Sequence, residues 1–204
     1  MVERQLRRRG ITDKRVLAAM GEIPRELFIA EEERHRTYND EPVAIGHGQT
    51  ISQPYMTALM AQSLELRGAE SVLEVGAGSG YHAAVLGALA ARVVAIELIP
   101  ELAGQARRNL EAAGRAGNVR IIAGDGSLGF AECAPYDAIS VAAGAPGIPA
   151  ALLEQLNDPG HLVIPVGDRD EQELHIVTKR AGALSTRTST ACRFVPLRGG
   201  EGWR

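Results

Sequence analysis

Cysteine and aromatic residues are scarce in this sequence. There are two cysteines, Cys133 and Cys192, and aromatic residues make up 4% of the 204 positions. The cysteines are far apart and form no Cys-x-x-Cys motif, so neither a disulfide framework nor a zinc site is indicated. Few rings are available for stacking on nucleic-acid bases. We therefore expect free thiols in a reducing compartment and no bound metal.

Long hydrophobic runs and a strong excess of one charge are also absent. No apolar stretch has the length of a membrane span, and the basic residues 1–10 are not followed by the apolar segment of a secretory signal. The net charge of −3 gives no general attraction to nucleic acid or acidic membranes. We therefore expect a cytoplasmic monomer that binds neither nucleic acid nor membranes.

The rest of the composition is typical of a globular protein, with 45% hydrophobic and 23% charged residues. A chain of 204 residues can bury one sizeable core. We expect a single domain over 1–204, in which 1–56 form an N-terminal helical extension with an active-site loop. Residues 57–204 are expected to form the core and its C-terminal strands.

The N-terminal extension is expected to be helical over 1–36, because its apolar residues recur at helical spacing. Thr12 or Asp13 can cap one of its helices, and Pro24 stops it. The arginines near the N-terminus could contact RNA. However, nearby glutamates offset them, and a solvated helical face is the favoured interpretation.

Strand-like and helix-like patterns alternate from residue 71 onward. Before them, 39–53 is expected to be a loop, and Pro54 suits the first turn of a helix that ends near Gly68. The alternation predicts an α/β, doubly wound, Rossmann-like fold with a mostly parallel central sheet. The expected strands are 72–75, 92–97, 119–122, 136–141, 160–166, 174–178 and 188–195, and the expected helices are 80–89, 101–113 and 149–156.

A glycine-rich loop follows the first of these strands and opens a helix, which is the setting in which such loops bind ligands. Its glycines, Gly76, Gly78 and Gly80, have the spacing G-x-G-x-G. The dinucleotide fingerprint is G-x-G-x-x-G, and Tyr81 occupies its third glycine position here. Glu74, just before the loop, would repel a pyrophosphate. Spacing and charge therefore disfavour a dinucleotide.

Three acidic residues stand at the ends of successive expected strands. Glu74 can attract the ammonium of an amino-acid moiety, Glu97 can accept both ribose hydroxyls, and Asp125 can reach an adenine amine. Together they suit a nucleoside with a cationic amino-acid tail and no phosphate. The sequence therefore predicts the cofactor S-adenosyl-L-methionine, whose product is S-adenosyl-L-homocysteine. Incidental acids around an ordinary strand–helix turn are the alternative.

A second motif lies upstream of the loop, where 46–56 read Gly-His-Gly-Gln-Thr-Ile-Ser-Gln-Pro-Tyr-Met. Together with 72–81, this segment closely resembles the protein-L-isoaspartate (D-aspartate) O-methyltransferase family. Many methyltransferases share the glycine loop, whereas Thr-Ile-Ser-Gln-Pro is nearly diagnostic of this family. The resemblance spans nearly the whole chain and implies a Rossmann-like S-adenosylmethionine-dependent methyltransferase fold. Further matching segments are 16–28, 124–126, 135–139, 162–167 and 193–197.

The resemblance implies an enzyme that methylates the free α-carboxylate of L-isoaspartyl residues in damaged proteins and peptides. The ester then collapses to a succinimide, which partly hydrolyses to normal aspartate, so repair begins. Ser52 corresponds to the family's catalytic residue. Residues 142–145, Ala-Ala-Gly-Ala, depart from the family's common Thr-Ala-Ala-Pro type of sequence near the substrate cleft. The implied cofactor-binding residues are Thr50, Ile51, Glu74, Gly76, Gly78, Glu97, Leu98, Asp125 and Gly126.

The chemistry is reasonable on physical grounds as well. An α-carboxyl group has a pKa of about 3.5, so it is already a carboxylate at neutral pH and needs no general base. Ser52 can donate a hydrogen bond that orients the acceptor, and it can also cap the helix that starts at Gln53-Pro54. His47 is then an ordinary loop residue.

Three other functions fit parts of the sequence. A methyltransferase acting on a small molecule or RNA would share the loop and the fold, but it gives no reason for the segment around Ser52. A nicotinamide-dependent oxidoreductase is disfavoured by the glycine spacing and by Glu74. A non-enzymatic binding module is disfavoured by the intact loop and its three acids.

Overall fold

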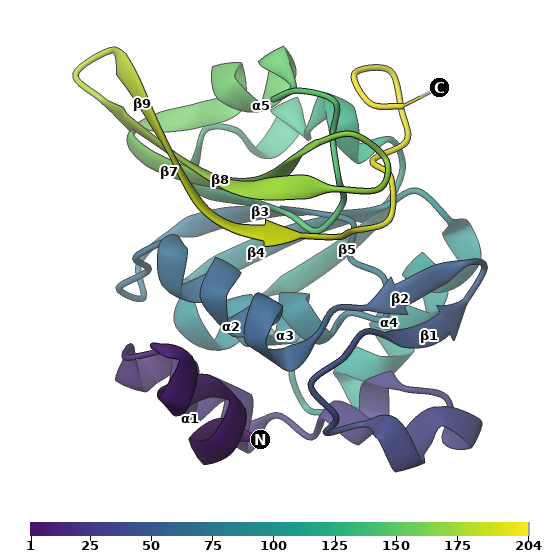
Figure 1. Ribbon diagram of the computed structural model, residues 1–204. Coiled ribbons are helices and arrows are strands. Elements are labelled where there is room, and N and C mark those ends of the chain that lie inside the picture. The colour runs from purple at the N-terminus through teal and green to yellow at the C-terminus, as the bar shows by residue number, and fades with distance from the viewer. Residues whose placement is uncertain (204) are drawn as a thin grey trace.

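Buried apolar segments form the centre of a seven-stranded sheet (Figure 1). This computed structural model describes residues 1–203. The strand order is β5-β4-β3-β6-β7-β8-β9; β3 to β7 are parallel, whereas β8 and β9 pair antiparallel at one edge. The predicted mostly parallel sheet is therefore confirmed. The strands are β3 (Ser71–Val75), β4 (Arg92–Glu97), β5 (Val119–Ala123), β6 (Tyr136–Val141), β7 (Leu156–Gly167), β8 (Gln172–Arg180) and β9 (Ala183–Cys192).

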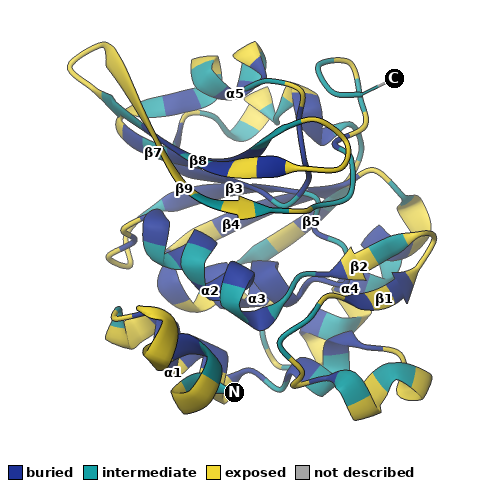
Figure 2. Ribbon diagram, in the orientation of Figure 1, coloured by how far each residue is buried: buried dark blue, intermediate teal, exposed yellow. Residues whose placement is uncertain are grey.

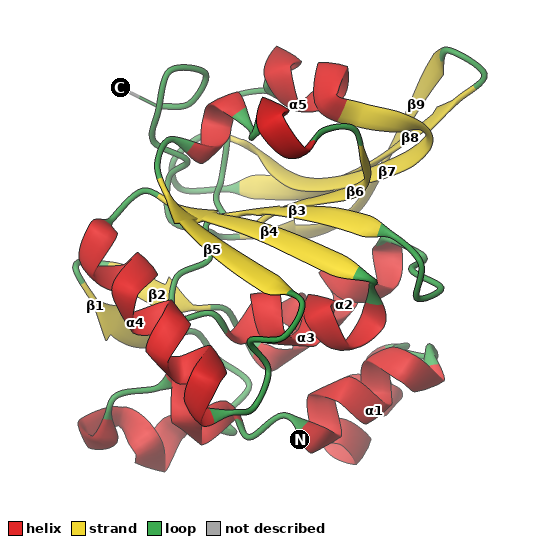
Figure 3. Cartoon of the chain, turned by 180° about the vertical axis from the view of Figure 1, so that it is seen from behind, coloured by secondary structure: helices red, strands yellow, loops and turns green. Residues whose placement is uncertain are grey.

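Helices cover both faces of this sheet (Figures 1 and 3). Four of them share one apolar core with the strands, and α5 (Ala150–Gln155) packs with a second core on the opposite face. Figure 2 shows buried residues along the strands and on the inner sides of the helices. Among residues 1–203, no helix has both the length and the apolar character needed to cross a membrane. The four helices are α1 (Lys14–Glu22), α2 (Pro54–Ser63), α3 (Tyr81–Leu89) and α4 (Pro100–Ala112).

The N-terminal extension is less regular than predicted. Only α1 is an α-helix, and its cap is Asp13, whose side chain accepts hydrogen bonds from the N–H groups of Arg15 and Val16. Gly10 takes a left-handed φ of 90°, and Ile23 before Pro24 is extended, so the helical pattern is interrupted at both places. The rest of the predicted helical span consists of short π and 3-10 turns at Val2–Leu6, Arg7–Arg9, Arg25–Phe28 and Glu31–Arg36.

Part of the predicted loop 39–53 is a β-hairpin. β1 (Val43–Gly46) pairs antiparallel with β2 (Gln49–Ile51). His47 and the glycines on either side of it all have positive φ, which is the conformation that a tight hairpin turn requires. The prediction of a loop was wrong because the two strands are only 4 and 3 residues long, too short for a clear strand pattern in the sequence.

Several other boundaries differ from expectation, and two of them lie next to left-handed residues. α2 ends at Ser63 rather than near Gly68, and Glu65 follows with a φ of 53°. β9 begins at Ala183 rather than at 188, because Ala181 and Gly182, both with positive φ, make a short turn from β8.

Candidate active site

The candidate active site lies at the carboxyl ends of β3 to β6, where the strand order reverses between β3 and β6. Three adjoining cavities open there, and Thr50 and Ala142 line all of them. The first cavity contains Glu97 and Gly126, the second contains Glu74, and the third extends from Ser52 toward the C-terminal segment. The hairpin and the residue after it thus bring Thr50, Ile51 and Ser52 to the glycine loop.

Glu97, at the end of β4, is held in the first cavity by two backbone amides. The N–H of Gly78 donates to one carboxylate oxygen at 2.8 Å, and the N–H of Ile99 donates to the other at 2.9 Å. Each carboxylate oxygen retains a second acceptor position. Glu97 can therefore accept two further donors, such as the two hydroxyls of a ribose.

Two glycines line the first cavity at positions that disfavour a side chain. Gly76 has a left-handed φ of 88°. A Cβ atom on Gly126 would lie 2.6 Å from Cγ1 of Val75, which is too close for any real contact. Leu98 lines the same cavity and is 42% exposed, so it offers apolar surface to a ring. These features fit a flat nucleoside.

Asp125 is more constrained than the sequence suggested. Its Oδ1 accepts from the N–H and the hydroxyl of Ser127, and its Oδ2 accepts from the N–H of Gly200 at 2.7 Å. Burial alone would raise the Asp125 pKa, but these hydrogen bonds outweigh it and lower the pKa. Within residues 1–203, Gly126 lines the first cavity and Asp125 lines none of the three. Asp125 therefore anchors the C-terminal segment, and its contact with adenine stays a prediction.

Glu74 is a buried acid without a hydrogen bond. It is 0% exposed, and both carboxylate oxygens lack a partner among the described residues. Nδ1 of His82 lies 3.6 Å from one of these oxygens, beyond the usual hydrogen-bond distance. Burial raises the Glu74 pKa well above its ordinary value, and the nearby negative charge of Glu97 is a second, smaller cause of this rise. Because such a group is costly to bury alone, this site favours a cationic ligand group with N–H donors.

Ser52 lies at the junction of the second and third cavities and lines both of them. The prediction that it caps α2 was wrong. Gln53 occupies the N-cap position without a side-chain capping bond, and its amide donates instead to the carbonyl of Asp40. Pro54 begins the helix as predicted. The hydroxyl of Ser52 is therefore not committed to capping α2.

A buried arginine, which the sequence did not single out, fixes the backbone of Ser52. Nη2 of Arg25 donates to the Ser52 carbonyl at 2.8 Å, and its Nε donates to the Thr37 carbonyl at 2.9 Å. The guanidinium carbon lies 4.8 Å from the ring centre of Tyr81, at the start of α3. Burial lowers the Arg25 pKa, although a guanidinium stays protonated in proteins. Arg25 thus connects the N-terminal extension, Ser52 and the glycine loop.

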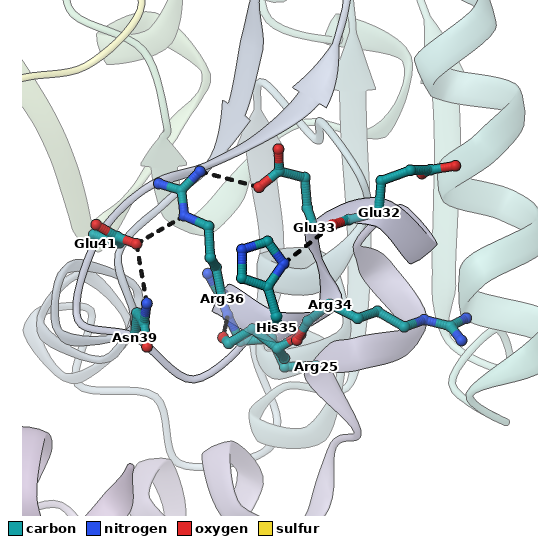
Figure 4. Close-up of polar contacts among 9 residues, drawn as sticks. Arg25, Glu32, Glu33, Arg34, His35, Arg36, Asn39 and Glu41 are labelled. Atoms are coloured by element: carbon teal, nitrogen blue, oxygen red, sulfur yellow. Dashed lines mark hydrogen bonds and ion pairs between the residues drawn. The ribbon is translucent and has the colours of Figure 1, made fainter.

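The segment that leads from Arg25 to the hairpin is ordered by a polar network (Figure 4). Arg36 donates to Glu33 at 3.0 Å and to Glu41 at 2.9 Å, and Asn39 donates to Glu41. These pairs are partly exposed, so each stabilises the fold only weakly. Their effect is local: they order the chain immediately before Pro42, which lines the third cavity.

The C-terminal segment forms another wall of the site. The N–H of Gly144 donates to the Val195 carbonyl, and the N–H of Leu197 donates back to the Gly144 carbonyl, both at 2.8 Å. Val195 lines the first and third cavities. The departure from the family pattern at 142–145 therefore lies where the C-terminal segment joins the sheet. Sequence reasoning missed this wall because the pairing spans more than fifty residues.

The family model described as protein-L-isoaspartate (D-aspartate) O-methyltransferase matches residues 1–202. The chain belongs to this family. It is 54% identical over 205 residues to protein-L-isoaspartate O-methyltransferase 2 of Marinobacter nauticus, covering 100% of this chain and 93% of the relative. It is 51% identical over 215 residues to the Hyperthermus butylicus protein-L-isoaspartate O-methyltransferase, covering 100% of this chain and 89% of the relative.

Solved structures of this methyltransferase family have the same fold. A protein-L-isoaspartate O-methyltransferase superposes with a TM-score of 0.85 at 30% identity, over 98% of this chain and 67% of the other. A Plasmodium falciparum structure described as this enzyme in complex with S-adenosyl-L-homocysteine gives a TM-score of 0.81 at 29% identity, over 97% of this chain and 96% of the other. The predicted Rossmann-like methyltransferase fold is therefore confirmed.

Proposed function

We propose that this protein transfers a methyl group from S-adenosylmethionine to the free α-carboxylate of L-isoaspartyl residues in damaged proteins and peptides, and so initiates their repair. The position of Ser52 carries this proposal. It stands where the second cavity, which contains Glu74, meets the third cavity. An acceptor in the third cavity would meet Ser52 beside a cofactor bound in the other two.

The residues present fit this cofactor. Glu97 would accept the ribose hydroxyls, the unpaired carboxylate of Glu74 would receive the ammonium, and Leu98 would contact the adenine. The cofactor would also contact other residues that line these cavities, namely Thr50, Ile51, Gly76 and Gly78. Gly126 lines the first cavity and has no side chain that would collide with Val75. The bound cofactor supplies a methyl group that its sulfonium has already activated.

Ser52 acts by orientation in this proposal. The acceptor carboxylate is ionised at neutral pH, so no side chain has to remove a proton. The Ser52 hydroxyl donates a hydrogen bond to one acceptor oxygen, while Arg25 holds the Ser52 backbone in place. His47, at the exposed turn of the hairpin, takes no part.

Recognition of the peptide is proposed to rely on backbone, because damaged sites occur in many sequence contexts. The third cavity is lined by Pro42, next to the hairpin, and by 193–195 after β9. An extended peptide between them could pair with backbone groups other than the Val195 carbonyl and the Phe194 N–H, which Gly144 and Gln172 already engage. The cytoplasmic location and the monomeric state stay predictions.

Replacing Ser52 with alanine is expected to lower kcat for methyl transfer to an isoaspartyl peptide by about tenfold, because one orienting hydrogen bond is lost. The dissociation constant of S-adenosylhomocysteine should change by less than about twofold, because the hydroxyl does not position the acids of the cofactor cavities. Labelled methyl transfer and calorimetric binding measure the two effects. An equal loss of cofactor binding would reject this role for Ser52, and an absence of transfer by the native protein would reject the proposed function.

A further inference from the structure

A buried histidine lies beside Glu74 in the second cavity. His82 is the second residue of α3, is 8% exposed and lines this cavity together with Glu74 and Ser52. Its Nδ1 lies 3.6 Å from a Glu74 oxygen, and its Nε2 is buried without a partner among residues 1–203. Burial lowers the His82 pKa to about 4, so the ring is neutral at physiological pH. A neutral imidazole has one N–H donor to offer.

A third polar group without a partner lies on the same face of the sheet. Ser140 on β6 stands directly opposite Glu74 on β3 in the strand register, and both residues are fully buried. No described residue makes a hydrogen bond to the hydroxyl of Ser140. Buried polar side chains in folded proteins nearly always have partners. Glu74 and His82 line the second cavity, whereas Ser140 lines none of the three, so a ligand in the second cavity can reach Glu74 and His82.

A primary ammonium is the ligand group that this pair of residues fits. It carries three N–H donors and a positive charge, while Glu74, which lines the second cavity, offers two carboxylate oxygens. An anionic group would be repelled by Glu74 and by the nearby Glu97. For the ammonium to be bound well, the Glu74 carboxylate must be ionised and must point into the cavity. His82 lies 3.6 Å from the Glu74 carboxylate and can influence both properties.

We propose that His82 is a positioning residue. Its Nδ1, now 3.6 Å from a Glu74 oxygen, closes to a hydrogen bond when the cofactor binds, and the Nδ1–H then holds the Glu74 carboxylate in the orientation that receives the cofactor's ammonium. The inference rests on the proposed function only for the identity of the cofactor. Donation from Nδ1 restricts rotation of the carboxylate and favours its charged form. The neutral ring adds no positive charge that would repel the ammonium. His82 acts through Glu74 and needs no contact with the methyl group or the acceptor.

Binding of two nucleosides to matched variants tests this role. S-adenosylhomocysteine carries the ammonium, whereas 5′-methylthioadenosine keeps the adenosine and the thioether but lacks the amino-acid end. The His82→Leu variant should bind S-adenosylhomocysteine roughly tenfold more weakly and 5′-methylthioadenosine within about twofold of the native protein. His82→Asn should retain most of the affinity, because its amide nitrogen sits at the same distance along the side chain as Nδ1.

His175→Leu is the matched control, because His175 lies on β8 and lines none of the three cavities. Its affinities for both nucleosides should equal those of the native protein. Unchanged S-adenosylhomocysteine binding in His82→Leu, equal losses for both nucleosides, or an Asn variant as weak as the Leu variant would overturn the proposal. Native protein that binds S-adenosylhomocysteine but methylates no isoaspartyl peptide would reject the proposed function and leave the role of His82 standing. Native protein that binds neither nucleoside would reject both.

Discussion

Replacing Glu97 with alanine is expected to weaken S-adenosylhomocysteine binding by about 100-fold or more. In the proposed complex, the variant loses two charge-assisted hydrogen bonds to the ribose, each of which contributes about 1.5–3 kcal/mol. It also frees the N–H groups of Gly78 and Ile99, which the carboxylate now holds at 2.8 and 2.9 Å. The glycine loop therefore loses one of its links to the end of β4, while the N–H groups of Gly76 and Ala77 still donate to the Ile96 carbonyl. Isothermal titration calorimetry measures the effect directly.

Glu101→Ala is the matched control for this change, because Glu101 is an exposed acid in the first turn of α4. Its removal alters the net charge by the same amount without touching the first cavity, so binding should stay within about twofold of native. The affinity of Glu97→Gln for S-adenosylhomocysteine should lie between those of the two alanine variants, because a neutral amide can accept one hydrogen bond but lacks the charge. If Glu97→Ala and Glu101→Ala bound equally well, the ribose role of Glu97 would be wrong.

Arg25→Met is expected to lower the free energy of unfolding by about 2 kcal/mol or more. The two carbonyls of Thr37 and Ser52 lose their donors in a buried place, and each unpaired group costs roughly 1–3 kcal/mol. The methionine recovers part of this through apolar packing beside Tyr81, because it no longer buries a charge. Urea unfolding followed by circular dichroism measures the difference.

The same variant should reduce kcat by more than it reduces cofactor affinity. Arg25 fixes the Ser52 backbone and makes no hydrogen bond to the acids of the first two cavities. Arg8→Met is the control, because Arg8 is exposed on the N-terminal turns and should change neither stability nor rate. An Arg25→Met protein with native unfolding energy and native kcat would show that the contact with Ser52 has no consequence.

Several features of the site were predictable because they depend on short stretches of sequence. Glu74 and Glu97 end adjacent parallel strands, and parallel strands bring their carboxyl ends to one edge of a sheet. The displaced third glycine distinguished the loop from a dinucleotide site. Ser52 became a candidate only through the family resemblance of its segment, since a lone serine before Pro54 carries no chemical signal.

Other features depend on contacts between distant segments and could not be predicted. Arg25 reaches Ser52 across 27 positions, and Gly200 donates to Asp125 across 75 positions. The sequence placed Asp125 at a strand end correctly, but it could not reveal that the C-terminal segment uses its carboxylate. Local conformation caused the remaining errors: Gln53 rather than Ser52 occupies the cap position of α2. The division of the chain at residue 56 stays a prediction.

The central claim is that the acceptor is the α-carboxylate of an isoaspartyl residue. Its most direct test is a mass-spectrometric time course with S-adenosylmethionine and two peptides of identical sequence, one containing L-isoaspartate and one containing L-aspartate. We predict that the isoaspartyl peptide gains one methyl group, then passes to a succinimide and partly to the aspartyl peptide, while the aspartyl peptide is unchanged. Equal methylation of both peptides, or of neither by protein that binds the cofactor, would contradict this account.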